Sequence, residues 1–135
     1  MRGTQARDYR GDQTDMRTVN PSELLSEAAI QRQILDLLKL KGIFAWKASS
    51  TGIYDQKRGA FRKNPHTVGV ADIIAIFDYE HDSGTCGQFW AIECKSSKGK
   101  LSAAQESFRA SVILNGGKYT LAYSVDDVIK ALEGK

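Results

Sequence analysis

The sequence predicts an α/β domain in which a mixed β-sheet is flanked by helices, in the order αβββαβ with a further C-terminal helix. An unbroken apolar run at residues 73–77 is typical of a central strand that is covered on both faces. Capping signals mark helix starts before and after the three central strands. Because a helix separates the third strand from the fourth, we expect these two strands to be parallel and joined by a right-handed crossover.

The composition indicates one domain rather than two. The chain has 135 residues, of which 41% are hydrophobic, and this is enough for a single core. Lys and Arg number 19 against 16 Asp and Glu, and the net charge of +3 permits a polyanionic partner without requiring one. Residues 1–20 are polar and lack apolar periodicity, so we predict a flexible arm there and a folded domain at 21–135.

Two features indicate an intracellular protein. The N-terminus lacks the apolar segment of a signal peptide, and no apolar run approaches the ~20 residues of a membrane span. The two cysteines, Cys86 and Cys94, form no CxxC pattern, so neither a structural zinc site nor a disulfide framework is expected. We therefore expect a cytoplasmic protein with no membrane partner.

The first helix is predicted to start at Asn20 and to stop at Gly42. Asn20 is a suitable N-cap, Pro21 suits the first helical position, and Glu23 completes a capping box. Gly42 follows Lys41 as a typical C-terminal stop signal.

Glu27 occupies an unexpected place on this helix. It extends the apolar stripe by one turn, so it is expected to face the edge of the core rather than water. An acid near a helix N-terminus is also favoured by the helix dipole alone, and a role in a site is the alternative. The stripe itself consists of Ile30, Ile34, Leu37 and Leu38.

The segment 49–67, after a first strand at 43–48, is rich in glycine and in basic residues and is predicted to be a hairpin or a long loop. Such charge is often only solvated surface. The functional interpretation is contact with phosphates, with Tyr54 and Phe61 packing against a sugar or a base. The basic residues are Lys57, Arg58, Arg62 and Lys63.

The next two strands are predicted at 71–77 and 88–95, with a turn at 78–87 between them. A basic connection with Lys98 and Lys100 follows, and it is either surface charge or a means of steering a phosphate toward the next helix.

The C-terminal half is predicted to contain a helix, a strand and a last helix. Residues 102–105 form a capping box, and the helix ends at 115–117. A fourth strand at 118–123 precedes the last helix at 124–132. The residues of the first of these helices expected to point inward are Phe108, Val112 and Ile113.

A candidate catalytic site lies at the end of the third strand. Alternation places Glu93 and Lys95 on one face, and a neighbouring strand is expected to bring Asp72 beside Glu93. Phosphodiester cleavage needs a cation that neutralises phosphate oxygens and a water that acts as nucleophile. Mg²⁺ suits this site, with two carboxylates and the backbone carbonyl of Cys94 as ligands, while the Cys94 side chain is a core filler. The side chains of Trp90 and Ile92 are expected to point to the same face as Cys94, opposite Glu93 and Lys95.

The spacing of Asp72, twenty further residues and then Glu93-x-Lys95 resembles the signature of the PD-(D/E)xK nuclease superfamily, which has a restriction-endonuclease-like fold. A wider set of residues resembles the VRR-NUC nuclease domain from about Ser22 to Leu132. In order, these residues are Glu27, Gly69-Val70-Ala71-Asp72, Ile92-Glu93-Cys94-Lys95, Gly99-Lys100-Leu101-Ser102, Gln105 and Gly116-Gly117-Lys118-Tyr119.

The resemblance is to the free-standing members of this family that are typical of bacteriophages. It implies an endonuclease dependent on Mg²⁺ or Mn²⁺ that acts on branched DNA, such as a four-way (Holliday) junction or a flap. It also implies a homodimer, which would work in the host cytoplasm if the chain is encoded by a phage.

The resemblance also implies a role for each site residue. Asp72 and Glu93 are expected to bind the metal, and Lys95 is the catalytic lysine. Glu27 is expected to approach the metal directly or through a water, and Gln105 to line the site from the following helix. Ala71 departs from the superfamily pattern, which usually has a proline there, but no reacting group is changed.

Other interpretations stay open for these residues and for the whole chain. Gln105 fits a capping box without any substrate, and an ExK pattern is often a solvent-facing pair on a strand. The same fold also serves nucleases that are nonspecific or sequence-specific. Outside the enzymes, the alternatives are a DNA-binding module without catalysis and a protein-interaction domain.

Overall fold

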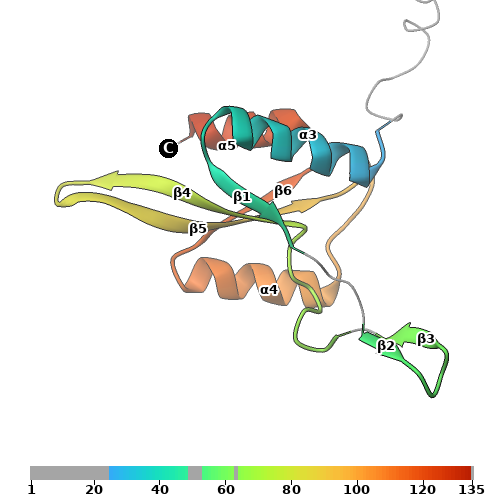
Figure 1. The fold of residues 1–135 in the computed structure, drawn as a ribbon. Coiled ribbons are helices and arrows are strands. Elements are labelled where there is room, and N and C mark those ends of the chain that lie inside the picture. Colours follow the sequence, from blue (N-terminus) through green and yellow to red (C-terminus); the bar gives the residue numbers. More distant parts are fainter. Residues whose placement is uncertain (1–24, 49–52, 63, 135) are drawn as a thin grey trace, which may run out of the picture.

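A computed structural model describes residues 25–48, 53–62 and 64–134 of the chain. Its centre is a four-stranded sheet in the order β1-β4-β5-β6, with helices α3 and α5 on one face and α4 on the other (Figure 1). This arrangement confirms the predicted α/β class with a mixed sheet flanked by helices. The elements are α3 (Glu27–Leu40), β1 (Phe44–Lys47), β2 (Ile53–Asp55), β3 (Ala60–Arg62), β4 (Ile73–His81), β5 (Gly84–Cys94), α4 (Ala103–Leu114), β6 (Lys118–Ala122) and α5 (Val125–Glu133).

The pairing of the strands positions the candidate site. β4 is antiparallel to both of its neighbours, β1 and β5, whereas β5 and β6 are parallel, as predicted for strands joined through a helix. Ile73 of β4 lies opposite Ile92 of β5, so Asp72 and Glu93 are neighbours at the same end of the sheet. The separate β2–β3 hairpin stands away from the main sheet (Figure 1).

The two faces of the sheet have different cores. On the α3/α5 face, one buried cluster joins side chains of both helices to inward residues of the strands, with Trp90 and Ile92 among the largest. On the α4 face, a smaller cluster contains Ala71, Ile74, Ala91 and Val112. Alternation along each strand separates these two sets, and apolar burial on both faces stabilises the sheet.

Helix α3 begins later than the sequence predicted. Leu25 and Ser26 are not helical, Ser26 is the N-cap with extended backbone, and its side chain accepts a hydrogen bond from Ala29 N at 3.1 Å. A start at Pro21 with one continuous helix is therefore wrong, because the serine supplies the cap that ends the extended segment. Asn20, Pro21, Glu23 and the predicted arm at 1–20 lie outside the described residues.

The predicted turn at 78–87 is also wrong. β4 continues to His81 and β5 starts at Gly84, so the two strands form a long ribbon with a turn of only two residues (Figure 1). Polar residues and glycines in this segment reflect a ribbon that is exposed on both faces, since none of the described helices covers it. The hairpin alternative for 49–67 is confirmed for the described residues of that segment by β2 and β3.

One smaller expectation about the C-terminal helices is wrong. Ile113 is 54% exposed rather than inward, because α4 already presents Phe108 and Val112 to the sheet and the next residue lies 100° around the helix. Ser124 is the N-cap of α5 but makes no side-chain capping bond. Asp127 instead accepts a hydrogen bond from Tyr123 N at 2.8 Å. In the described part of the chain, no helix has both the length and the apolar character needed to cross a bilayer.

Candidate active site

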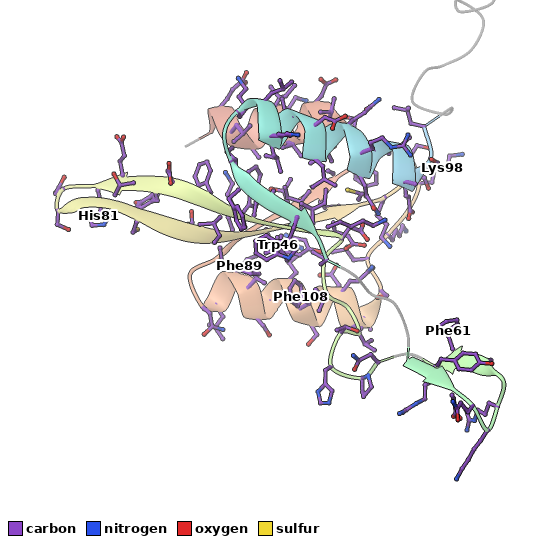
Figure 2. The ribbon with its side chains drawn as sticks, in the orientation of Figure 1. Trp46, Phe61, His81, Phe89, Lys98 and Phe108 are labelled. Carbon is purple, nitrogen blue, oxygen red and sulfur yellow. The ribbon has the colours of Figure 1, made fainter. Side chains whose placement is uncertain are left out.

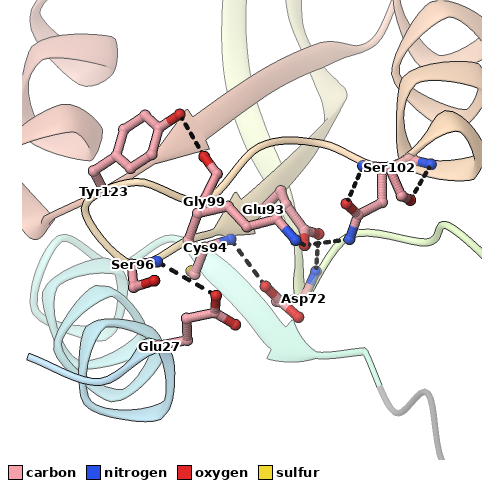
Figure 3. A network of polar contacts seen from close by, with 10 residues as sticks. Glu27, Asp72, Glu93, Cys94, Ser96, Gly99, Ser102 and Tyr123 are labelled. Carbon is pink, nitrogen blue, oxygen red and sulfur yellow. Dashed lines mark hydrogen bonds and ion pairs between the residues drawn. The ribbon is translucent and has the colours of Figure 1, made fainter.

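Asp72 and Glu93 are locked together by reciprocal hydrogen bonds at the end of β4 and β5 (Figure 3). The backbone N–H of Asp72 donates to Glu93 Oε2 at 3.2 Å. The backbone N–H of Cys94 donates to Asp72 Oδ2 at 2.9 Å. Each carboxylate is thus held by the backbone of the other strand, and the predicted juxtaposition of the two acids is confirmed.

Lys95 and Gln105 both contact the buried carboxylate. Lys95 Nζ lies 3.6 Å from Glu93 Oε1, and Gln105 Nε2 donates to the same oxygen at 2.7 Å. Gln105 Oε1 also accepts from Ser102 N at 2.9 Å, which completes the capping box of α4. The capping-box interpretation of Gln105 is therefore confirmed, and the same amide also contacts Glu93, while its role in a catalytic site stays a prediction.

Glu27 reaches the same end of the sheet from the first turn of α3. Its Oε1 accepts a hydrogen bond from Ser96 N at 3.3 Å, just after β5 ends (Figure 3). The residue is exposed, so the expectation that it faces the core edge rather than water is wrong. A carboxylate in the first turn is compatible with the helix dipole, and its contact with Ser96 places it at the border of the site.

Glu93 is the one buried charged residue in the described part of the chain, with 2% of its surface exposed. Burial, reinforced by the charge of Asp72, raises the pKa of Glu93 to about 7, while Lys95 acts in the opposite direction. A carboxyl that titrates near neutrality is favoured as an anion once a cation approaches it. This is the electrostatic behaviour expected of a metal ligand or of a group that exchanges protons.

The Cys94 side chain takes no part in this chemistry. It is fully buried in the cluster on the α3/α5 face, together with Trp90 and Ile92. Burial, followed by the charges of Asp72, Glu93 and Glu27, raises the pKa of its thiol to about 12. The thiol therefore stays protonated at neutral pH, and the prediction that it fills the core is confirmed. Cys86 and Cys94 are both free.

The donor set for a cation is small. Across residues 25–48, 53–62 and 64–134, no three side chains of His, Cys, Asp or Glu come together as a metal-holding group. Two adjacent carboxylates still suit Mg²⁺, which commonly binds one or two carboxylates and completes its shell with waters and substrate oxygens. Metal ligation by Asp72, Glu93, the Cys94 carbonyl and Glu27 therefore stays a prediction.

The described basic residues that were predicted to bind DNA lie on two exposed segments. Lys57, Arg58 and Arg62 are exposed on the β2–β3 hairpin, where Arg58 approaches Asp55 at 3.9 Å. Lys98 and Lys100 are exposed in the connection between β5 and α4. Lys63 lies outside the described residues.

Tyr119 is a candidate site residue for which sequence reasoning assigned no role. It lies on β6 beside Ala91, and its hydroxyl is buried without a hydrogen-bond partner among the described residues. Burial and then the nearby charge of Glu93 raise the pKa of Tyr119. The segment Gly116-Gly117-Lys118-Tyr119 was noted in the sequence, but the face on which Tyr119 lies became apparent only from the order and register of the strands.

Comparisons with protein-family models, with curated proteins and with solved structures give no match to this chain.

Proposed function

We propose that this protein is a metal-dependent DNA endonuclease with a restriction-endonuclease-like core. The observation that carries the proposal is the cluster of Asp72, Glu93, Lys95 and Gln105, in which a buried carboxyl with a pKa near neutrality touches both a lysine and an amide. Desolvating an acid in this way costs stability, and such costs are typical of functional sites. The order αβββαβ of the main sheet and its helices is compatible with that core.

Each residue has a distinct task in the proposed hydrolysis. Asp72 and Glu93 would hold Mg²⁺ or Mn²⁺, which supplies charge neutralisation of the phosphate and a more acidic water. Lys95 holds the attacking water or stabilises the charge that develops on the phosphate oxygens. Gln105 orients the Glu93 carboxylate through its 2.7 Å hydrogen bond. The water oxygen bonds to phosphorus, the P–O bond to the leaving oxygen breaks, and that oxygen takes up a proton.

The substrate we propose is branched DNA, either a four-way junction or a flap. The basis is the resemblance of the chain to VRR-NUC domains, together with a hairpin that offers Lys57, Arg58 and Arg62 for phosphate contacts. Tyr54 and Phe61 on this hairpin are exposed and lie 5.2 Å apart, so they are available to a sugar or base. We also propose a homodimer, since two symmetry-related sites serve both strands of a junction.

The test is cleavage of a labelled four-way junction, a flap and a linear duplex of matched sequence, in Mg²⁺, Mn²⁺ or EDTA. We expect metal-dependent cuts in the branched substrates, and a loss of at least about a hundredfold in Lys95→Ala and Asp72→Ala, as for removal of one transition-state donor. Lys39→Ala is the matched control, because Lys39 is an exposed lysine in the last turn of α3.

Three outcomes would contradict parts of this proposal. Equal cutting of linear duplex would replace the branched substrate with a nonspecific or sequence-specific nuclease. Intact substrates that nevertheless bind with steep salt dependence would leave a DNA-binding module without catalysis. A monomer by gel filtration with light scattering would exclude the dimer.

A further inference from the structure

A set of exposed apolar side chains lies on the α4 face of the sheet and takes no part in the site described above. We call Phe44, Trp46, Ile76 and Phe89 the aromatic platform. Phe44 is 67% exposed and the other three are each 43% exposed. Phe44, Ile76 and Phe89 are direct neighbours across three strands, and the rings of Phe44 and Trp46 lie 5.3 Å apart.

The backbone pattern decides which face carries the platform. Ala45 and Ala75 pack into the cluster on the α3/α5 face. The residues that alternate with them, Phe44, Trp46 and Ile76, therefore point to the α4 face. Figure 2 shows Trp46 and Phe89 on the side of the sheet toward α4. The helix covers Ala91 and Ile74 through Val112 and leaves the platform open.

The platform begins beside the carboxylates. Trp46 is paired with Ile74, which lies two residues beyond Asp72, a separation of about 7 Å along the strand. Glu93 lies two residues after Ala91 on β5, so both side chains point to the α4 face, as Trp46 does. A nucleotide spans a comparable distance between its phosphate and its base, so a phosphate at the carboxylates leaves a neighbouring base over Trp46.

The charges around the platform favour a short nucleic-acid strand. Lys95 has the same alternation as Ala91 and Glu93, so it lies on the α4 face beside the carboxylates, whereas Lys47, next to Trp46, points to the other face. At the opposite end, Asp78 and Glu80 follow Ile76 at intervals of two residues along β4, so all three side chains point to the same face. The lysine at one end attracts a phosphate backbone and the acids at the other end repel it, so a bound strand would not continue along the ribbon.

We propose that the aromatic platform stacks unpaired bases of the strand whose phosphate lies at Asp72 and Glu93. Flat exposed rings bind single-stranded nucleic acids in this way, because every base offers a π-face. Apolar side chains gathered on an open sheet face also mark an interaction surface. The inference rests on the proposed nuclease and narrows its substrate to DNA with unpaired nucleotides beside the cleaved bond.

The two tryptophans of the chain allow a direct test without catalysis. Trp90 is fully buried and Trp46 is exposed, so a stacked base will quench Trp46 alone. The full-length protein in EDTA is titrated with a short oligothymidylate, and we expect quenching that disappears in Trp46→Phe. By anisotropy of the labelled oligonucleotide, Trp46→Ala should weaken binding about tenfold.

Tyr79→Ala is the matched control. Tyr79 is an exposed aromatic residue on the ribbon, and it points to the opposite face because it alternates with Asp78 and Glu80. We expect it to bind the oligonucleotide as the wild type does. Equal losses of affinity for the oligonucleotide in both variants, or no loss in Trp46→Ala, would overturn the proposal that bases stack on the platform.

Other outcomes separate this inference from the nuclease proposal. Quenching of Trp46 without any cleavage in Mg²⁺ would retain the platform and overturn the nuclease. Cleavage of branched DNA without quenching of Trp46 would retain the nuclease proposal and overturn the stacking of bases on the platform. Trp46 emission that shifts with protein concentration in the absence of DNA would mean that a second copy covers the platform, and the proposal would be wrong.

Discussion

The two faces of the central sheet are built from the same strands but use their residues differently. Among the described residues, the cluster on the α3/α5 face has eleven buried apolar residues, whereas the cluster on the α4 face has four. The α4 face also carries the buried carboxylate of Glu93 and the exposed rings of Phe44 and Trp46. Because side chains alternate along each strand, one face provides the hydrophobic stabilisation of the sheet. The other face holds a buried charge and exposed rings, which lower the stability of the folded protein.

The largest predicted difference between the faces is in the two tryptophans. Trp90 packs edge-on against Phe77 and donates to Thr120 Oγ1 at 2.9 Å, so Trp90→Ala should lower the free energy of unfolding by about 3–5 kcal/mol. Trp46→Ala should change it by less than about 0.5 kcal/mol. Urea denaturation followed by circular dichroism measures both, and if Trp90→Ala does not fold, Trp90→Phe gives a smaller loss. Similar losses at the two sites would contradict the division of the sheet.

The sequence predicted the α3/α5 face better than the rest of the fold, for a physical reason. The apolar stripe on the first helix has strong periodicity, and the unbroken apolar run from Ile73 to Phe77 is typical of a strand that this helix can cover. The ribbon at 78–87 was missed because strands without a covering helix have a composition like that of a turn. The start of α3 at Glu27 was missed because two N-cap signals compete, at Asn20 and at Ser26.

The candidate site was predictable where it depends on neighbours along the chain. Alternation alone put Glu93 and Lys95 together, and they lie 3.6 Å apart. The bond between Asp72 and Glu93 needed only the pairing of adjacent strands. Tyr119 and Trp46 were not assigned to this face, because their position depends on which strands are neighbours and in what register, and local patterns do not contain that information.

A second prediction concerns the buried carboxyl on the α4 face. The pKa of Glu93 is about 7 in the folded protein and 4.5 in a free side chain, so the folded state binds more protons between these values. Stability conferred by the protonated carboxyl is complete below pH 4.5 and is lost as pH rises through 7. Glu93→Gln mimics the protonated form. At pH 8 its free energy of unfolding should therefore exceed that of the wild type by roughly 3 kcal/mol. Chemical denaturation of both proteins across this range measures the difference.

Magnesium provides the control for the effect at Glu93. If the carboxylates bind the cation, excess Mg²⁺ at pH 8 should raise the melting temperature of the wild type and not that of Glu93→Gln. Lys39→Ala should respond as the wild type does. A wild type that is indifferent to Mg²⁺, or a stability difference that does not vary with pH, would remove the electrostatic argument for this site.

The smallest predicted difference, about 1–3 kcal/mol between two glycine variants, tests how α4 is seated against the site. Gly69 has φ +84°, and a Cβ there would overlap the carbonyl oxygen of Ala104, next to Gln105. Gly42 also has positive φ, at +71°, but nothing lies within 4 Å of its Cβ position. In both alanine variants the unfavourable backbone conformation should lower the free energy of unfolding by ~1–2 kcal/mol. In Gly69→Ala the overlap should lower it by about 1–3 kcal/mol more. Because the overlap pushes α4 from the sheet and loosens the bond from Gln105 to Glu93, cleavage should fall in Gly69→Ala alone. Equal stability and equal cleavage in the two variants would show that α4 adjusts without disturbing the carboxylates.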